Sequence, residues 1–221
     1  MSLWLAFLVA MAAAAGGTNF FQLTPKQFNE STEAKQEIRF EAVNSELLSA
    51  AVLHETNRRR AEKGLPALKH HPKAQQAAEI QSQIMKKRGS ISHDNPENPR
   101  YATLPKRVNS VGVNPGFAAE NVATAFGLQY QSGRGFYKRE QAGKTIFSYL
   151  PNGAAIRPHT YESFARALVE AWMNSPGHRD NILHKEPQYL GVSCVGATGE
   201  SGMPVFYCTQ VFLAPMKVIR R

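Results

Sequence analysis

Three features of this 221-residue chain predict an α+β domain built in layers. Apolar residues recur at helical spacing in three separate segments. Two segments near the C-terminal end, 190–196 and 205–213, have the pattern of strands, and the Gly-rich segment 197–203 joins them as in an antiparallel hairpin. Helices that precede such a hairpin are typical of layers packed against a sheet.

The first residues predict export. Residues 2–17 carry no charge and are almost wholly apolar, and Ala13 and Ala15 offer a small-residue cleavage site. This pattern is typical of a signal peptide over residues 1–17, with an uncleaved membrane anchor as the alternative. We therefore expect a secreted or periplasmic protein that has no transmembrane span once the signal is removed.

The charge balance favours anionic partners. The net charge of +9 suits an anionic cell-wall polymer, lipid head groups or a peptide. The sharpest basic run is Arg58-Arg59-Arg60, and consecutive helical residues point in different directions, so we interpret it as solvated surface. No recognition motif accompanies the charge, so we expect no specific nucleic acid partner. We expect a monomer.

The chain before the domain is predicted to be an arm over residues 18–44. Thr24, followed by Pro25, can start a short helix there, and the polar, acidic residues after it have the composition of a linker. The first long helix begins at Asn44 and ends at Gly64, which is a typical helix terminator. A domain of residues 45–213 follows from this start.

The middle of the chain contains one clear helix. It runs from Pro72 to Gly89, and its buried face is predicted to be rich in alanine, which indicates close packing on another layer. Residues 90–118 show no period and are predicted to be loop. The run 121–125 is the start of either a strand or a helix. Residues 127–159 are expected to form a long insertion over the domain surface.

The last third holds two helix starts and the hairpin. Thr160 can cap a third helix, and Ser175 followed by Pro176 can start a short fourth one. The hairpin places Cys194 and Cys208 on neighbouring strands, which favours a disulfide, with two buried free thiols as the alternative. Residues 214–221 form a basic C-terminal tail.

Five fragments resemble the CAP superfamily of cysteine-rich secretory, antigen 5 and pathogenesis-related proteins. In chain order, they are LHETNRRR with GLPAL after it (53–60 and 64–68), SHD (92–94), AENVA (119–123), AWMNSPGHRDNIL (171–183) and YCTQVF (207–212). The fourth fragment is similar to the bacterial branch, an SCP-type domain. The resemblance implies a three-layer α-β-α sandwich with an antiparallel sheet and an open cleft on one side.

The resemblance also implies a candidate metal site, which is incomplete here. Many eukaryotic members surround the cleft with two His and two Glu that can hold zinc. His93 and Glu120 match one His and one Glu, while Ser175 and Tyr207 stand at the other two positions. Two ligands are too few for a tight zinc site, although His178 is a possible third. We therefore expect no required cofactor, and a bound zinc ion is the less favoured alternative.

The sequence proposes one cleft with two possible roles. Its candidate residues are His93, Glu120, Asn121, His178, Tyr207 and Gln210. His93 and Glu120 can act as general acid and base, or can form a structural hydrogen bond that closes two loops. His178 can likewise be structural, and Tyr207 and Gln210 can lie on the plain surface instead.

Two classes of function follow from these residues. The first is a binding module whose cleft engages a cell-wall, lipid or peptide ligand. The second is a peptidase-like hydrolase that uses His93 and Glu120 as catalytic residues, with water or a weakly bound divalent metal. The incomplete set of ligands favours the first class, which is not an enzyme.

Overall fold

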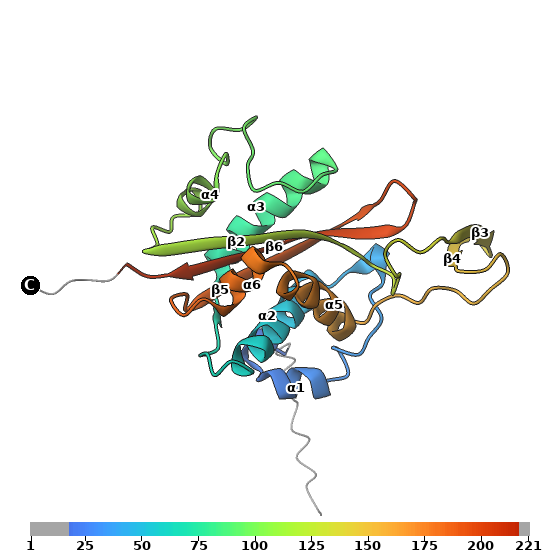
Figure 1. Ribbon diagram of the computed structural model, residues 1–221, viewed down its shortest axis with the longest axis horizontal. Helices are drawn as coiled ribbons and strands as arrows, with labels where there is room; N and C mark the ends of the chain where they lie inside the picture. The colour runs from blue at the N-terminus through green and yellow to red at the C-terminus, as the bar shows by residue number, and fades with distance from the viewer. Residues whose placement is uncertain (1–17, 217–221) are drawn as a thin grey trace, which may run out of the picture.

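The computed structural model describes residues 18–216 and has helices on both faces of one sheet (Figure 1). The predicted signal segment, and residues 217–221 of the predicted tail, lie outside the described residues. The helices are α1 (Pro25–Glu30), α2 (Ser45–Ala61), α3 (Pro72–Arg88), α4 (Leu104–Ser110), α5 (Tyr161–Met173) and α6 (Pro176–Leu183), with short 3-10 turns at Phe20–Gln22 and Phe40–Ala42. The strands are β1 (Lys69–His70), β2 (Phe117–Phe126), β3 (Tyr137–Gln141), β4 (Lys144–Ser148), β5 (Tyr189–Thr198) and β6 (Pro204–Ala214).

The main sheet has the strand order β1-β5-β6-β2. Strands β5, β6 and β2 are antiparallel, and the two-residue β1 pairs with β5 in parallel. Helices α3 and α4 cover one face, while α2, α5 and α6 lie on the other (Figure 1). The predicted three-layer α-β-α sandwich is therefore confirmed, with one short parallel pair added to the antiparallel sheet.

The long helices begin at the predicted caps, and α3 ends at the predicted Gly89, but α2 ends at Ala61, three residues before Gly64. The Asn44 side chain accepts from the Leu47 N–H at the start of α2, and Thr160 forms a capping box at the start of α5. Gly89 ends α3 in the left-handed conformation, at a φ of 69°. The Asn44 and Thr160 side chains satisfy backbone N–H groups that a helix start leaves unpaired, and Gly89 allows the turn that ends α3. Such residues can be recognised in a sequence, which is why these positions were predicted.

Helix α3 packs very closely on the sheet. Its alanines at 74, 77 and 78 are buried together with Val211 and Leu213 of β6. A Cβ at position 191 of β5 would overlap the backbone of Ala74, so only glycine allows this approach. The predicted alanine-rich face thus sets the distance between the two layers.

Three expectations from the sequence differ from the structure. Residues 90–118 contain helix α4, which is too short to show a period in the sequence. The arm is not a linker, because Phe28, Ala34 and Ile38 are buried in the main core. Arg60 is not solvated surface: it is fully buried and donates to the carbonyls of Pro66, Ile182 and His184.

The segment 127–159, expected to be an insertion over the domain surface, instead projects from one end of the domain (Figure 1). Strands β3 and β4 pair as an antiparallel hairpin within it. Phe147 and Ile156 form a small core with Met203, which lies in the turn between β5 and β6. This small core attaches the segment 127–159 to one end of the main sheet.

The two cysteines form a disulfide. Cys194 of β5 lies directly opposite Cys208 of β6, and their Cα atoms are 4.1 Å apart. The disulfide therefore links the two strands of the predicted hairpin. Among residues 18–216, no helix is both long and apolar enough to span a membrane.

Candidate functional site

Glu120 is the buried anchor of the candidate site. It lies on β2 opposite Val211 of β6, so its side chain shares the sheet face that α3 and α4 cover. Only 3% of the side chain is exposed. A carboxylate in such a position requires hydrogen-bonding or charged partners, since burial alone opposes its ionised form.

His93 supplies one partner from the loop after α3. Its Nδ1 lies 2.9 Å from Oε1 of Glu120, and 53% of its side chain is exposed. Gln81 of α3 donates to the carbonyl of Ser92 and so fixes the preceding residue. The imidazole is thus held by one nitrogen, while the ring reaches solvent.

Arg107 of α4 supplies the second partner and was not predicted. Its fully buried guanidinium donates to both Glu120 oxygens, at 2.9 and 2.7 Å. It also donates to the carbonyls of His93 and Tyr101, at 3.0 and 3.1 Å. Arg107 therefore neutralises the carboxylate and ties the His93 loop to the same point. The available signal was Pro105, which allows a helix start within the segment we interpreted as loop.

The two histidines near this site have opposite pKa shifts. The hydrogen bond that His93 donates to Glu120 raises the pKa of His93, against the smaller, opposing effect of the partial burial of its ring. Burial lowers the pKa of His178, and the positive charge on His93 lowers it further. Protonation is therefore favoured at His93, and His178 of α6 lies close enough to be affected by it.

Asn121 and Gln210 do not line the cleft as predicted. They are paired residues of β2 and β6 on the opposite sheet face from Glu120, since side chains alternate along a strand. Both are fully buried. The Asn121 amide donates to Gln210 and to the His178 carbonyl, both at 3.1 Å, and Gln210 donates to Thr56 of α2 at 2.7 Å. This network joins β2, β6, α2 and α6 as internal structure.

Tyr207 does not line the predicted cleft either. It is on the same sheet face as Glu120, but only 8% exposed, and it packs with Met85 of α3 and Val122 of β2. Ser175 is the N-cap position of α6. Of the six predicted cleft residues, His93 therefore remains at the surface, with the buried Glu120 as its partner and His178 nearby.

The residues present do not fit the metal site that the eukaryotic members carry. A cation at Glu120 would have to share the carboxylate with the Arg107 guanidinium, which already contacts both oxygens. Within residues 18–216, no three His, Cys, Asp or Glu side chains converge as a metal-binding group. The donor set and its charge are instead those of an ion pair with a histidine beside it.

The chain belongs to the cysteine-rich secretory protein (CAP) family, whose sequence model matches residues 53–212. This match contains all five fragments, and it agrees with the α-β-α layers described above. A search of curated proteins finds no match.

Three solved structures are similar to this chain at low sequence identity. An extracellular protein with an SCP domain from Bacillus anthracis is 21% identical, with a TM-score of 0.52, over 87% of this chain and 44% of that one. An outer surface protein of Borrelia burgdorferi is 13% identical, with a TM-score of 0.48, over 75% of this chain and 90% of that one. A cysteine-rich secretory protein of Staphylococcus aureus is 17% identical, with a TM-score of 0.44, over 77% of this chain and 39% of that one. This chain therefore spans less than half of the Bacillus protein.

Proposed function

We propose that this protein is an exported CAP domain that binds an anionic ligand at His93. The observation that carries the proposal is the double contact of Arg107 with Glu120. The charges of Glu120 and Arg107 cancel inside the site, so protonation of His93 adds one positive charge at the surface, close enough to Asp94 to interact with its carboxylate. A protonated imidazole that is half exposed can donate to a phosphate or carboxylate group.

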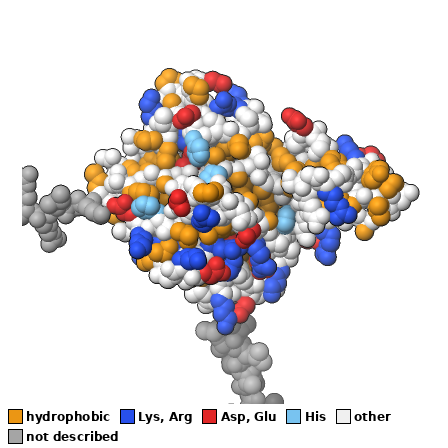
Figure 2. Space-filling model, in the orientation of Figure 1, with side chains coloured by type: hydrophobic (Ala, Val, Ile, Leu, Met, Phe, Trp, Pro, Cys, Tyr) orange, Lys and Arg blue, Asp and Glu red, His pale blue; other side chains and the backbone are white. Residues whose placement is uncertain are grey.

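The surroundings of His93 support an anionic ligand. A cavity of about 290 Å³ borders the same loop, and its lining residues include two cations, Lys87 and Arg88, one carboxylate, Glu97, and the buried Asn95. Arg88 also donates to the carbonyl of Asp94, next to His93. Figure 2 shows histidine side chains at the surface, apart from most Lys and Arg side chains of this face, so the nearby basic charge is that of Lys87 and Arg88. The ligand class we infer is an anionic cell-wall polymer or lipid head group.

Export is supported by three observations of different kinds. The apolar N-terminal segment has the pattern of a signal peptide. The Cys194–Cys208 disulfide persists most readily in an oxidising compartment. The Bacillus anthracis protein that shares the fold is an extracellular protein. We infer a secreted or periplasmic location.

Binding of soluble poly(glycerol phosphate) at pH 6 and pH 9 tests the proposal. His93→Gln is expected to weaken binding several-fold at pH 6 and to have no effect at pH 9, where the imidazole is neutral. His184→Gln is the matched control, because His184 is an exposed histidine outside the site. Equal affinity of His93→Gln and the wild type at pH 6 would contradict the proposal. Vesicles with anionic lipid, used in parallel, distinguish the lipid from the polymer.

The alternative is a hydrolase, and one observation favours it. Glu120 holds Nδ1 of His93 at 2.9 Å, an arrangement that can orient an imidazole to take a proton from water. The raised pKa of His93 weakens this role, since a protonated imidazole cannot take a proton from water. Turnover of peptide or wall substrates that is lost in His93→Gln while the variant stays folded would establish the hydrolase.

A further inference from the structure

One edge of strand β5 is open over most of its length. Strand β6 pairs with β5 along one side, from Tyr189 to Thr198. On the other side, β1 pairs only with Tyr189 and Leu190. Within the part of the chain that the structure describes, no strand covers that edge beyond Leu190. This edge lies at the opposite end of the sheet order from β2, which carries Glu120, so it is separate from the site above.

Two distances show which backbone groups face the open edge. The His71 N–H donates to the Leu190 carbonyl at 3.1 Å, so the main chain of Leu190 points towards β1. Because this direction repeats at every second residue, Cys194 and Gly196 point the same way. The Cα separation of 4.1 Å between Cys194 and Cys208 agrees, since short separations are typical of antiparallel pairs without mutual hydrogen bonds. The N–H and C=O groups of Cys194 and Gly196 therefore point away from β6.

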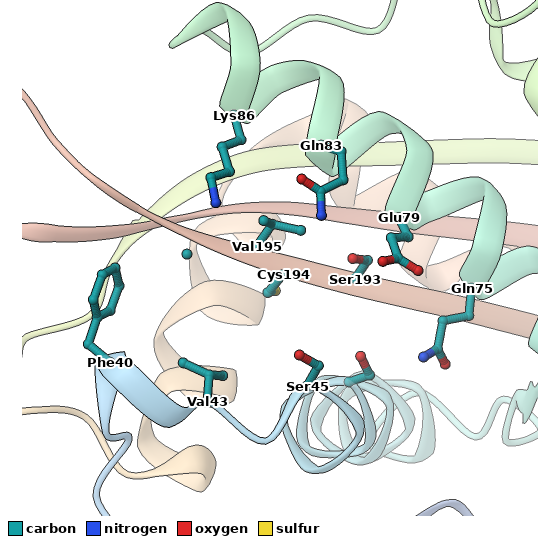
Figure 3. Close-up of a pocket in the computed structure, with 12 residues that line it drawn as sticks. Phe40, Val43, Ser45, Gln75, Glu79, Gln83, Lys86, Ser193, Cys194 and Val195 are labelled. Carbon is teal, nitrogen blue, oxygen red and sulfur yellow. The ribbon is translucent and has the colours of Figure 1, made fainter.

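A groove lies along this edge, with a cavity of about 250 Å³ (Figure 3). Four side chains of α3 form one wall and point towards the strand in Figure 3: Gln75, Glu79, Gln83 and Lys86. The other wall is formed by Phe40, Val43, Ser45 and Ser49. Gln75 is already hydrogen-bonded to His70, but the Gln83 amide can hydrogen-bond a second main chain. Phe40 and Val43 offer an apolar contact for one side chain of that second chain.

We propose that this groove binds an extended peptide segment, which adds to β5 as a strand. Pairing with an open sheet edge is a general mode of peptide recognition, in which main-chain hydrogen bonds supply affinity and side-chain contacts supply specificity. The edge lies between α2 and α3, which cover opposite faces of the sheet, and the added strand would lie in the groove between them. The Cys194–Cys208 disulfide holds the floor of the groove to β6.

The charges on the α3 wall define the peptide further. Glu79 and Lys86 are both exposed, and neither forms a salt bridge among residues 18–216. They are two helical turns apart, or about 11 Å. That length corresponds to about three residues of an extended strand. The fitting segment therefore carries a basic residue opposite Glu79 and an acidic residue or terminal carboxylate, about three positions away, near Lys86.

Selection from a phage-displayed library of random linear peptides provides the probe. The full chain is the target, and synthetic copies of the enriched peptide are then titrated against variants. Gln83→Trp fills the groove from an exposed position and is expected to weaken binding at least about tenfold. Gln76→Trp is the matched control, because Gln76 is an exposed glutamine of the same helix that lies outside this groove. It is expected to leave binding unchanged.

N-methylation along the selected peptide tests the strand geometry itself. Each N-methyl group removes one backbone donor, so binding is expected to fall about three- to tenfold at alternate positions and to change little between them. Amide resonances of Cys194 and Gly196 are expected to shift on binding. A library that yields no binder, a binder insensitive to Gln83→Trp, or an N-methyl scan without alternation would each overturn the proposal.

Discussion

The buried ion pair of Glu120 and Arg107 determines what the candidate site can do. Both side chains are almost inaccessible to water, and each is the main charged partner of the other. A buried pair of this kind contributes little net stability compared with apolar residues, but loss of one partner leaves an uncompensated charge. The surface chemistry is consequently left to His93, which shares one carboxylate oxygen with the guanidinium.

Substitution of Arg107 alone is expected to be severe. Arg107→Met leaves Glu120 buried without its cation, and the free energy of unfolding should fall by about 3–5 kcal/mol. The double variant Arg107→Met with Glu120→Leu should recover a large part of that loss, because no charge then remains buried. Urea unfolding followed by circular dichroism measures both. Equal stability of Arg107→Met and the wild type would show that the ion pair is absent in solution.

The pKa of His93 predicts a pH-dependent contribution to stability. Because the pKa is raised in the folded state, the stabilisation is fully present below the ordinary histidine pKa of about 6.5 and is lost as pH rises through the raised value. His93→Gln should therefore destabilise by about 0.5 kcal/mol at pH 5.5 and by nothing measurable at pH 9, since the exposed half of the ring is screened by solvent.

His178 provides the contrasting control for that measurement. Its pKa is lowered in the folded state, so it opposes folding as pH falls. His178→Gln should accordingly reduce the loss of stability between pH 7 and pH 5.5. The same sign for both variants would contradict the assigned shifts.

At the scale of elements, the contact between α3 and β5 fixes the geometry of both proposed sites. Helix α3 holds the His93 loop through Gln81 and forms a wall of the β5 groove. Its distance from the sheet is set by Gly191, where the strand meets the backbone of Ala74 and Gln75. The alanine period of α3 predicted a close contact, but no feature of the sequence identified its partner on the strand.

Gly191→Ala tests this contact. The added methyl group meets helix backbone, which cannot rotate away as a side chain can, so we expect a destabilisation of about 3 kcal/mol. Gly177→Ala is the control, because no atom lies within 4 Å of a Cβ at position 177 and its backbone has no positive φ. The melting temperatures of the two variants measure the difference. A neutral Gly191→Ala would mean that α3 and β5 pack less closely than described.

For the whole molecule, the sequence predicted the helices and the hairpin better than the arrangement of the site. Long helices have both a period and end signals, as at Asn44, Gly89 and Thr160. Helix α4 has only seven residues, so it has no measurable period, and Arg107 was missed with it. A buried arginine within an apparent loop is indistinguishable from a solvated one until its partner is placed.

The division of the predicted cleft has an equally simple reason. Glu120 and Asn121 are adjacent in the sequence, and adjacent strand residues point to opposite faces of a sheet. The resemblance to the family motif locates both residues on one strand but does not separate their roles. Their partners on β6 separate these roles, because Glu120 lies opposite Val211 and Asn121 lies opposite Gln210. The buried amide network therefore supports the fold, while the ion pair supports the surface histidine.

The most direct test of the central claim follows the His93 imidazole by NMR in the full chain at pH 6. The chain is titrated with poly(glycerol phosphate) and, separately, with zinc chloride. We predict that the polyanion shifts the His93 resonance and that stoichiometric zinc leaves it unchanged, because Arg107 already occupies the carboxylate of Glu120. A stoichiometric shift with zinc, together with no response to the polyanion, would contradict an anion-binding site and restore a metal-dependent role.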